Sequence, residues 1–144
     1  MPLPDINDYT SIGLPKTDAT YTDELFALSS EEIDVISKLE LGTALLLEHK
    51  DGQIDARYLL NTPTTLIGRN ESADILLDDN TISRKHALIT RQDNNWTLKD
   101  LASLNGTYIN GNRIENEAKI NSGDKILIGK YHFVFFANDK NVNK

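Results

Sequence analysis

The chain of 144 residues contains no cysteine, and only one methionine and one tryptophan. Without cysteine it can form no disulfide, no thiolate nucleophile and no cysteine-based metal site. No apolar run approaches the roughly 18 residues that a membrane helix requires. The N-terminus also lacks the basic start and apolar stretch of a secretory signal. We therefore expect a cytoplasmic protein with no membrane partner.

The sequence also lacks any excess of positive charge, because its net charge is −7. Residues 1–41 contain nine acidic residues and two lysines, which accounts for the whole net charge. Residues 42–144 contain 13 acidic and 13 basic residues and are neutral. A protein that binds nucleic acid needs a basic stripe to displace counterions, so this distribution argues against nucleic acid as a partner.

Composition divides the chain into three parts. Residues 1–41 are predicted to be a flexible acidic regulatory segment, since they contain few apolar residues to offset the entropy lost on ordering. Residues 42–137 are predicted to form one folded domain, and residues 138–144 a polar C-terminal tail. Within the first part, the S-x-x-E spacing from Ser29 to Glu32 predicts a short helix at about 30–39.

From residue 42 onward, short runs rich in leucine, isoleucine, valine and aromatic residues alternate with turn residues. Strands at near-regular spacing without intervening helices indicate an all-β sandwich or barrel, which we expect to contain about eleven strands. Asn110-Gly111 predicts a tight hairpin, because both residues tolerate positive φ. The runs that read most clearly as strands are 43–49, 57–60, 64–67, 74–77, 86–91, 96–99, 107–109, 125–128 and 132–136.

Aromatic residues in these runs are predicted to pack in the core rather than to stack on nucleic-acid bases, because they alternate in strand-like runs. They are Trp96, Tyr131, Phe133, Phe135 and Phe136.

Three polar motifs join these strand-like runs: Gly68-Arg69, Ser83-Arg84-Lys85-His86 and Ser103-Leu104-Asn105-Gly106-Thr107. A guanidinium offers several fixed donors to phosphate oxygens, and charge-assisted bonds of this kind are strong. A serine hydroxyl and backbone N–H groups complete such a site. The motifs therefore predict a site for a phosphorylated side chain.

The order and spacing of these motifs resemble the forkhead-associated (FHA) domain, a phosphothreonine-binding β-sandwich, over roughly residues 42–137. The resemblance implies that Arg69 and Ser83 bind phosphate and that Arg84 touches phosphate or peptide. Asn105 would hold the peptide backbone. Leu104 stands where many family members have threonine, so at most a backbone contact is expected there, and Ser103 is taken as a compensating contact. Supporting roles fall to Gly68, His86, Gly106 and Thr107.

His86 also raises the possibilities of a metal ligand or a catalytic base acting with Ser83. No other histidine lies at ligand spacing, and the loop contains no carboxylate to orient a base, so a structural role is preferred. Asn105-Gly106-Thr107 matches a glycosylation acceptor, which carries no weight without a secretory signal. We expect no enzyme activity, no cofactor and no metal.

The leading segment contains Thr17, Thr20 and Thr22. The chain resembles a bacterial subgroup of small FHA regulators of 2-oxoglutarate dehydrogenase and glutamate metabolism, in which a serine/threonine kinase phosphorylates the tail and the tail docks in its own FHA site. The subgroup's tail motif is absent here, so both Thr20 and Thr22 remain candidate phosphoacceptors, followed by Thr17. They could equally be ordinary polar residues of a disordered arm.

The resemblance thus implies a phosphothreonine-dependent signalling regulator. Its expected partners are a phosphothreonine protein or its own phosphorylated tail, a serine/threonine protein kinase, and the 2-oxoglutarate dehydrogenase complex or glutamate dehydrogenase. Two alternatives stay open. One is a clamp or scaffold that binds a metabolic enzyme without phosphate, and the other is a generic FHA adaptor for kinase substrates.

Overall fold

A computed structural model describes residues 28–138 of the chain. The candidate phosphoacceptors Thr17, Thr20 and Thr22 lie outside these residues, as does most of the arm for which disorder is expected. Residues 139–144 of the expected C-terminal tail also lie outside them.

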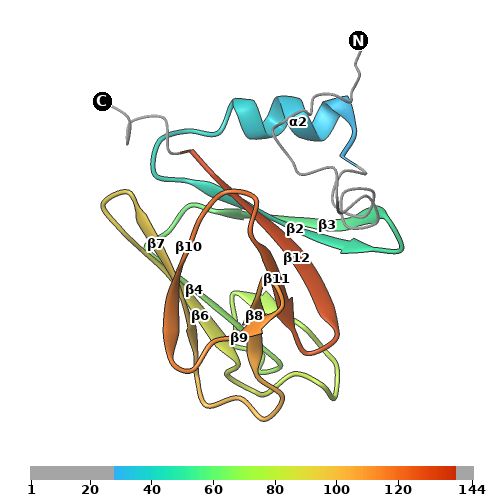
Figure 1. Ribbon diagram of the computed structural model, residues 1–144, viewed down its shortest axis with the longest axis vertical. Coiled ribbons are helices and arrows are strands. Elements are labelled where there is room, and N and C mark those ends of the chain that lie inside the picture. Colours follow the sequence, from blue (N-terminus) through green and yellow to red (C-terminus); the bar gives the residue numbers. More distant parts are fainter. Residues whose placement is uncertain (1–27, 139–144) are drawn as a thin grey trace.

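The described chain is a sandwich of two β-sheets with one short helix (Figure 1). One sheet has five strands in the order β10-β7-β6-β4-β5, and the other has six in the order β3-β2-β12-β11-β8-β9. The pairing is antiparallel except between β4 and β5. The elements are α2 (Ser30–Ser37), β2 (Ala44–Lys50), β3 (Gln53–Leu60), β4 (Thr64–Gly68), β5 (Ile75–Leu76), β6 (Ala87–Gln92), β7 (Asn95–Asp100), β8 (Thr107–Ile109), β9 (Asn112–Arg113), β10 (Glu117–Ile120), β11 (Lys125–Ile128) and β12 (Tyr131–Ala137).

The eleven described strands confirm the predicted all-β sandwich, but individual bounds differ. β3 begins at Gln53 rather than at residue 57. The β2–β3 turn is tight, so the polar first residues of β3 already pair with β2. β10 was not among the predicted runs, since its sequence Glu-Ala-Lys-Ile carries one strong strand former and is recognised as a strand only by pairing with β7. β5 is shorter than predicted.

The predicted hairpin at Asn110-Gly111 is present. Both residues have positive φ, 51° and 86°, and β8 pairs with β9 across them. A two-residue turn of this kind matches the right-handed twist of the strands that it joins.

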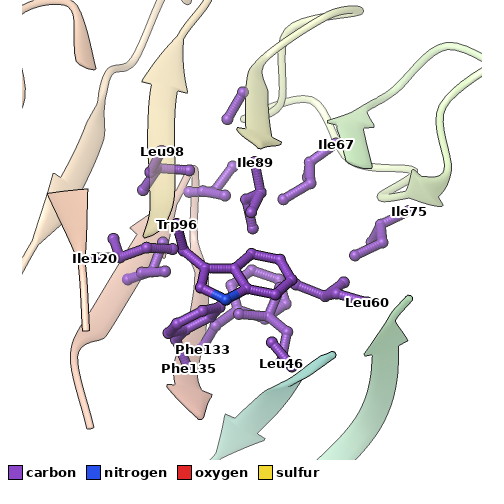
Figure 2. Packing of buried hydrophobic residues seen from close by; sticks show 14 of the residues in the cluster. Leu46, Leu60, Ile67, Ile75, Ile89, Trp96, Leu98, Ile120, Phe133 and Phe135 are labelled. Atoms are coloured by element: carbon purple, nitrogen blue, oxygen red, sulfur yellow. The ribbon is translucent and has the colours of Figure 1, made fainter. Parts of the chain in front are cut away.

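The core lies between the two sheets (Figure 2). Trp96 from β7 packs edge-on against Phe135 from β12, with ring centroids 5.5 Å apart. Phe133 and Phe135 are both fully buried there, which confirms the core assignment for these aromatics. Phe136 is the exception, because strand alternation turns it to the opposite face of β12, in register with Leu45.

Helix α2 begins at the predicted cap. Ser29 Oγ accepts a hydrogen bond from the Glu32 N–H at 3.2 Å, as the S-x-x-E spacing predicts. The Glu32 carboxylate also reaches back toward the Ser29 backbone, whose hydrogen bond contributes to lowering the pKa of Glu32. Its main partners are the Ser29 hydroxyl and the Arg57 guanidinium of β3, with the Arg57 Nε donor at 2.6 Å. The helix is thereby attached to the six-stranded sheet, at the end of the sandwich away from the loops that precede β6 and β8 (Figure 1).

Candidate functional site

The loop after β4 and the loop before β6 are held together by their backbones. The Arg69 N–H donates to Ser83 O and the Asn70 N–H to Arg84 O, each at 3.1 Å. The approach is so close that a Cβ on Gly68 would lie 2.0 Å from Arg84 O. Only glycine fits here without displacing the second loop. Gly68 therefore brings the first and second motifs into contact.

This contact also orients the Arg69 side chain. Arg69 Nε donates to the Ile82 carbonyl at 2.9 Å, while the side chain as a whole is exposed. A guanidinium has five N–H donors in a planar fork. With Nε bonded to protein, the four N–H donors of the terminal nitrogens remain for a partner, and two parallel donors suit a bidentate anion.

His86 joins the second and third motifs from inside the protein. The fully buried imidazole accepts a hydrogen bond from the Ser83 N–H at Nδ1 (3.0 Å), and its Nε2 lies 2.9 Å from Gly106 O. Because Nδ1 must accept, the neutral ring carries its proton on Nε2 and donates it to that carbonyl. Both nitrogens of His86 are thus occupied by backbone partners, an arrangement that fits a structural role.

The third loop is organised around the carboxylate of Asp100, which sequence reasoning missed. Asp100 Oδ1 accepts from Ser103 Oγ at 2.5 Å and from Thr107 Oγ1 at 2.7 Å. Burial raises the pKa of Asp100, but the hydrogen bonds from Ser103 and Thr107 outweigh it, so the pKa is lowered overall. The loop is built on an ionised carboxylate.

Ser103 therefore points inward rather than toward a ligand. Its hydroxyl donates to Asp100 and accepts from the Gly106 N–H at 2.9 Å, and the residue is buried. This placement differs from the expected ligand contact, because the small polar side chain is needed to close its own turn. Ser103 belongs with Thr107 among the residues that shape the loop.

Leu104 and Asn105 form the outward side of the same loop. The Leu104 N–H donates to Ser83 Oγ at 2.9 Å, as a backbone contact, and its side chain is 83% exposed. Since the Ser83 oxygen accepts there, its hydroxyl hydrogen is free to be donated elsewhere. Asn105 Nδ2 donates to Thr81 O at 2.9 Å, which leaves the amide oxygen and one N–H for a partner.

The structure thus brings Arg69, Ser83 and Asn105 to one end of the sandwich. Arg84 and Lys85 are exposed on the same loop as Ser83, and none of these cations forms an ion pair with an acidic residue within 28–138. The result is a cationic surface with oriented hydroxyl and amide groups, which can chemically hold a phosphate ester and an adjacent peptide.

A family model described as FHA domain matches residues 65–129. The chain is 42% identical over 99 residues to the oxoglutarate dehydrogenase inhibitor of Corynebacterium efficiens, a match that covers 69% of each chain. The chain belongs to the FHA domain family. It is also 38% identical to the glycogen accumulation regulator GarA of Mycolicibacterium smegmatis, over 73% of this chain and 66% of that protein.

Among solved structures, Mycobacterium tuberculosis EmbR in complex with a low-affinity phosphopeptide matches with a TM-score of 0.62 and 32% identity, over 76% of this chain and 29% of EmbR. The corynebacterial and mycobacterial relatives are matched over 64% to 72% of their own length. The chain thus spans about two thirds of them.

In this FHA domain, the loop before β6 is supported by a second set of residues to which the sequence analysis gave no role. Thr81 donates its N–H and its hydroxyl to Asp79 Oδ2 at 2.8 Å and 2.5 Å, and Asp79 pairs with Lys130 at 3.0 Å. The Thr81 bonds and the Lys130 ammonium lower the pKa of Asp79 to about 2. The D-x-T spacing of an Asx turn was the available sequence signal.

Within residues 28–138, no group of three or more histidine, cysteine, aspartate or glutamate side chains is placed to hold a metal ion. The helix that the structure describes is too short to cross a membrane.

Proposed function

We propose that the chain is a phosphothreonine-dependent protein-binding regulator. The observation that carries the proposal is the meeting of Arg69, Ser83 and Asn105 at one end of the sandwich. Each side chain is held by one hydrogen bond to the backbone of these loops and keeps further donors available. Arg69 and Ser83 would bind phosphate, Arg84 would add charge, and Asn105 would hold the peptide backbone. The EmbR complex with a phosphopeptide supports this ligand class.

The test uses the full-length unphosphorylated chain and synthetic peptides of residues 14–28 with phosphothreonine at position 17, 20 or 22. We expect at least one peptide to bind, and its unphosphorylated form not to bind. Arg69→Ala should weaken binding at least about 30-fold, equivalent to about 2 kcal/mol, because it removes a charge-assisted contact. Equal binding by Arg69→Ala and the unchanged protein would contradict the proposal.

We further propose that the regulator is switched by its own N-terminal segment. A serine/threonine kinase would phosphorylate Thr20 or Thr22, adding about 1.5–2 negative charges, and the phosphorylated segment would dock at Arg69 and Ser83. Because α2 lies at the end of the sandwich away from the loops that carry these two residues (Figure 1), docking would require α2 to leave β3. The chain from Thr22 to Gly42 would then span roughly 25 Å root-mean-square as a flexible tether. A short tether gives an effective concentration on the order of millimolar.

Self-docking predicts competition. The full-length chain phosphorylated on Thr20 or Thr22 should bind an external phosphothreonine peptide up to about a thousandfold more weakly than the unphosphorylated chain. Phosphatase treatment should restore binding. Unchanged binding after stoichiometric phosphorylation, verified by mass spectrometry, would exclude the switch while leaving the binding site itself intact.

The relatives named oxoglutarate dehydrogenase inhibitor support a metabolic target. We propose that the unphosphorylated chain acts on the 2-oxoglutarate dehydrogenase complex or on glutamate dehydrogenase. A clamp that needs no phosphate is a second candidate, favoured by the exposed Leu104 side chain beside the site. Inhibition that survives Arg69→Ala but falls in Leu104→Ser would assign the clamp. No effect on either enzyme would leave a general FHA adaptor.

A further inference from the structure

Arg113 is carried back to the site by the β8–β9 hairpin. The turn at Asn110-Gly111 sets Arg113 opposite Tyr108 in register, and the Ile114 N–H donates to Thr107 O at 2.9 Å. Arg113 is therefore far from Arg69 in sequence but adjacent to the loop that presents Asn105. Neither the motifs nor their spacing assigned it a role.

The Arg113 side chain lies directly against Gly106. A Cβ on Gly106 would be 2.8 Å from Arg113 Nε and 3.0 Å from its Cζ. The guanidinium therefore rests in the space that the absent side chain leaves, next to Asn105. Any larger residue at position 106 would push it away.

The charge of Arg113 is not neutralised within the described part of the chain. Arg113 is exposed and forms no ion pair with an acidic residue of 28–138. The two neighbours of Asn105 contact different partners: the Leu104 N–H bonds Ser83 Oγ, whereas Gly106 lies against the Arg113 guanidinium. A peptide held by its phosphate at Ser83 and by its backbone at Asn105 would therefore have this guanidinium within its reach.

We propose that Arg113 binds an acidic side chain of the ligand, close to the phosphothreonine, and so selects acidic over neutral partners. The inference rests on the proposed phosphothreonine binding. A planar guanidinium suits a carboxylate, which can accept two of its N–H donors at once. The chain's own segment supplies such groups: Asp23 follows Thr22 directly and lies three residues after Thr20, and Glu24 comes next.

The test is a double-mutant cycle on the full-length unphosphorylated chain. The probes are the 14–28 peptides phosphorylated at position 20 or 22, each as the natural sequence and with Asp23→Asn, Glu24→Gln or both. We expect the protein to prefer the natural peptide about threefold to tenfold, since a partly exposed charge pair contributes modestly. Arg113→Gln should abolish this preference, and Arg113→Lys should keep part of it.

A matched control separates local from general charge effects. Lys119→Gln removes one positive charge from the edge strand β10, where Lys119 faces Thr97 in register. It should keep the preference, and its melting temperature and that of Arg113→Gln should match the unchanged protein. The preference should also shrink as salt is raised, both in the unchanged protein and in Lys119→Gln.

Two results would overturn the inference. One is a preference for the natural peptide that persists in Arg113→Gln, and the other is an equal loss of affinity for natural and neutralised peptides, which indicates a purely structural role. Both results leave Arg69→Ala as the separate test of phosphate binding. If no phosphorylated peptide binds the unchanged protein, the proposed function and this inference fall together.

Discussion

At the residue scale, the site depends on two positions, 86 and 68, where neighbouring backbone groups determine which residue fits. His86 must carry an acceptor for the Ser83 N–H and a donor for the Gly106 carbonyl, and a neutral imidazole supplies both. Gly68 must carry no Cβ, because the neighbouring carbonyl occupies that space. Both residues are buried, yet both decide where the ligand-facing groups lie.

Gly68→Ala should be strongly destabilising. Its Cβ would displace the backbone of the loop before β6, at a cost of about 3 kcal/mol by analogy with overpacked cores. Gly52→Ala is the matched control: its φ is 79°, but nothing lies within 4 Å of the new Cβ. It should cost about 1 kcal/mol from backbone strain alone. Urea unfolding measures the free energy of unfolding of both variants. A larger loss of stability in Gly52→Ala than in Gly68→Ala would contradict the argument from the close approach of Gly68 to Arg84 O.

The stabilisation that Asp79 gives to the loop before β6 depends on pH only under acidic conditions. Its pKa is about 2 in the folded protein, below the ordinary 3.8, because Thr81 and Lys130 bind the ionised form. A lowered pKa stabilises the fold above the unfolded pKa, and this stabilisation disappears as the pH falls through the folded pKa.

The difference in stability between the natural protein and Asp79→Asn should therefore be constant above pH about 4.5 and shrink toward pH 2. Thermal unfolding followed between pH 2 and pH 7 measures it. A difference that grows as the pH falls would show that the carboxylate is not the group that Thr81 and Lys130 stabilise.

At the element scale, α2 is attached to the sheet mainly through one ionic contact. Glu32 is buried, and the Ser29 hydroxyl and then the Arg57 guanidinium lower its pKa despite that burial. Ile33 and Val35 on the helix are exposed, so little apolar surface holds it. An eight-residue helix is not stable alone in water.

Arg57→Gln should accordingly release the helix. We expect hydrogen exchange of residues 30–37 to accelerate at least about tenfold, because a buried carboxylate loses its charged partner. Lys38→Gln is the control, since it breaks the exposed pair with Asp34 at 3.2 Å, a pair worth only about 0.3–0.5 kcal/mol. Equal exchange rates in both variants would show that apolar packing holds α2. Release would also lengthen the tether to Thr22.

At the scale of the whole molecule, both sheets share one core. Trp96 comes from the five-stranded sheet and Phe135 from the six-stranded sheet, and their rings meet edge to face. The chain's only tryptophan therefore reports on the packing of the two sheets against each other. A single core predicts one cooperative unfolding transition.

Phe135→Ala should lower the free energy of unfolding by about 3–5 kcal/mol, because it leaves a cavity between the sheets. Tryptophan fluorescence and far-ultraviolet circular dichroism should report the same midpoint in the natural protein. Phe136→Ala, on the opposite face of β12, should cost less, since that residue is partly exposed. Two separate midpoints would mean that the sheets unfold independently.

Local sequence patterns were sufficient for most of the strands and for the hairpin. Alternating apolar residues and Asn110-Gly111 act through side-chain period and backbone preference, which are properties of neighbouring residues. β10 could not be found this way. Its polar sequence has weak strand preference of its own, and pairing with β7 supplies the missing hydrogen bonds.

The chemical identity of the anion-facing groups was likewise present in the sequence, in Arg69, Ser83 and Asn105. Their distances, the pairing of Asp79 with Lys130, the bond from Thr107 to Asp100 and the return of Arg113 to Gly106 were decided by tertiary structure. Each of these contacts joins residues that are separated in the sequence and that only the folded chain brings together. Residue types and short periods are local, whereas the partner of a buried or loop side chain depends on contacts that only the closed sandwich creates.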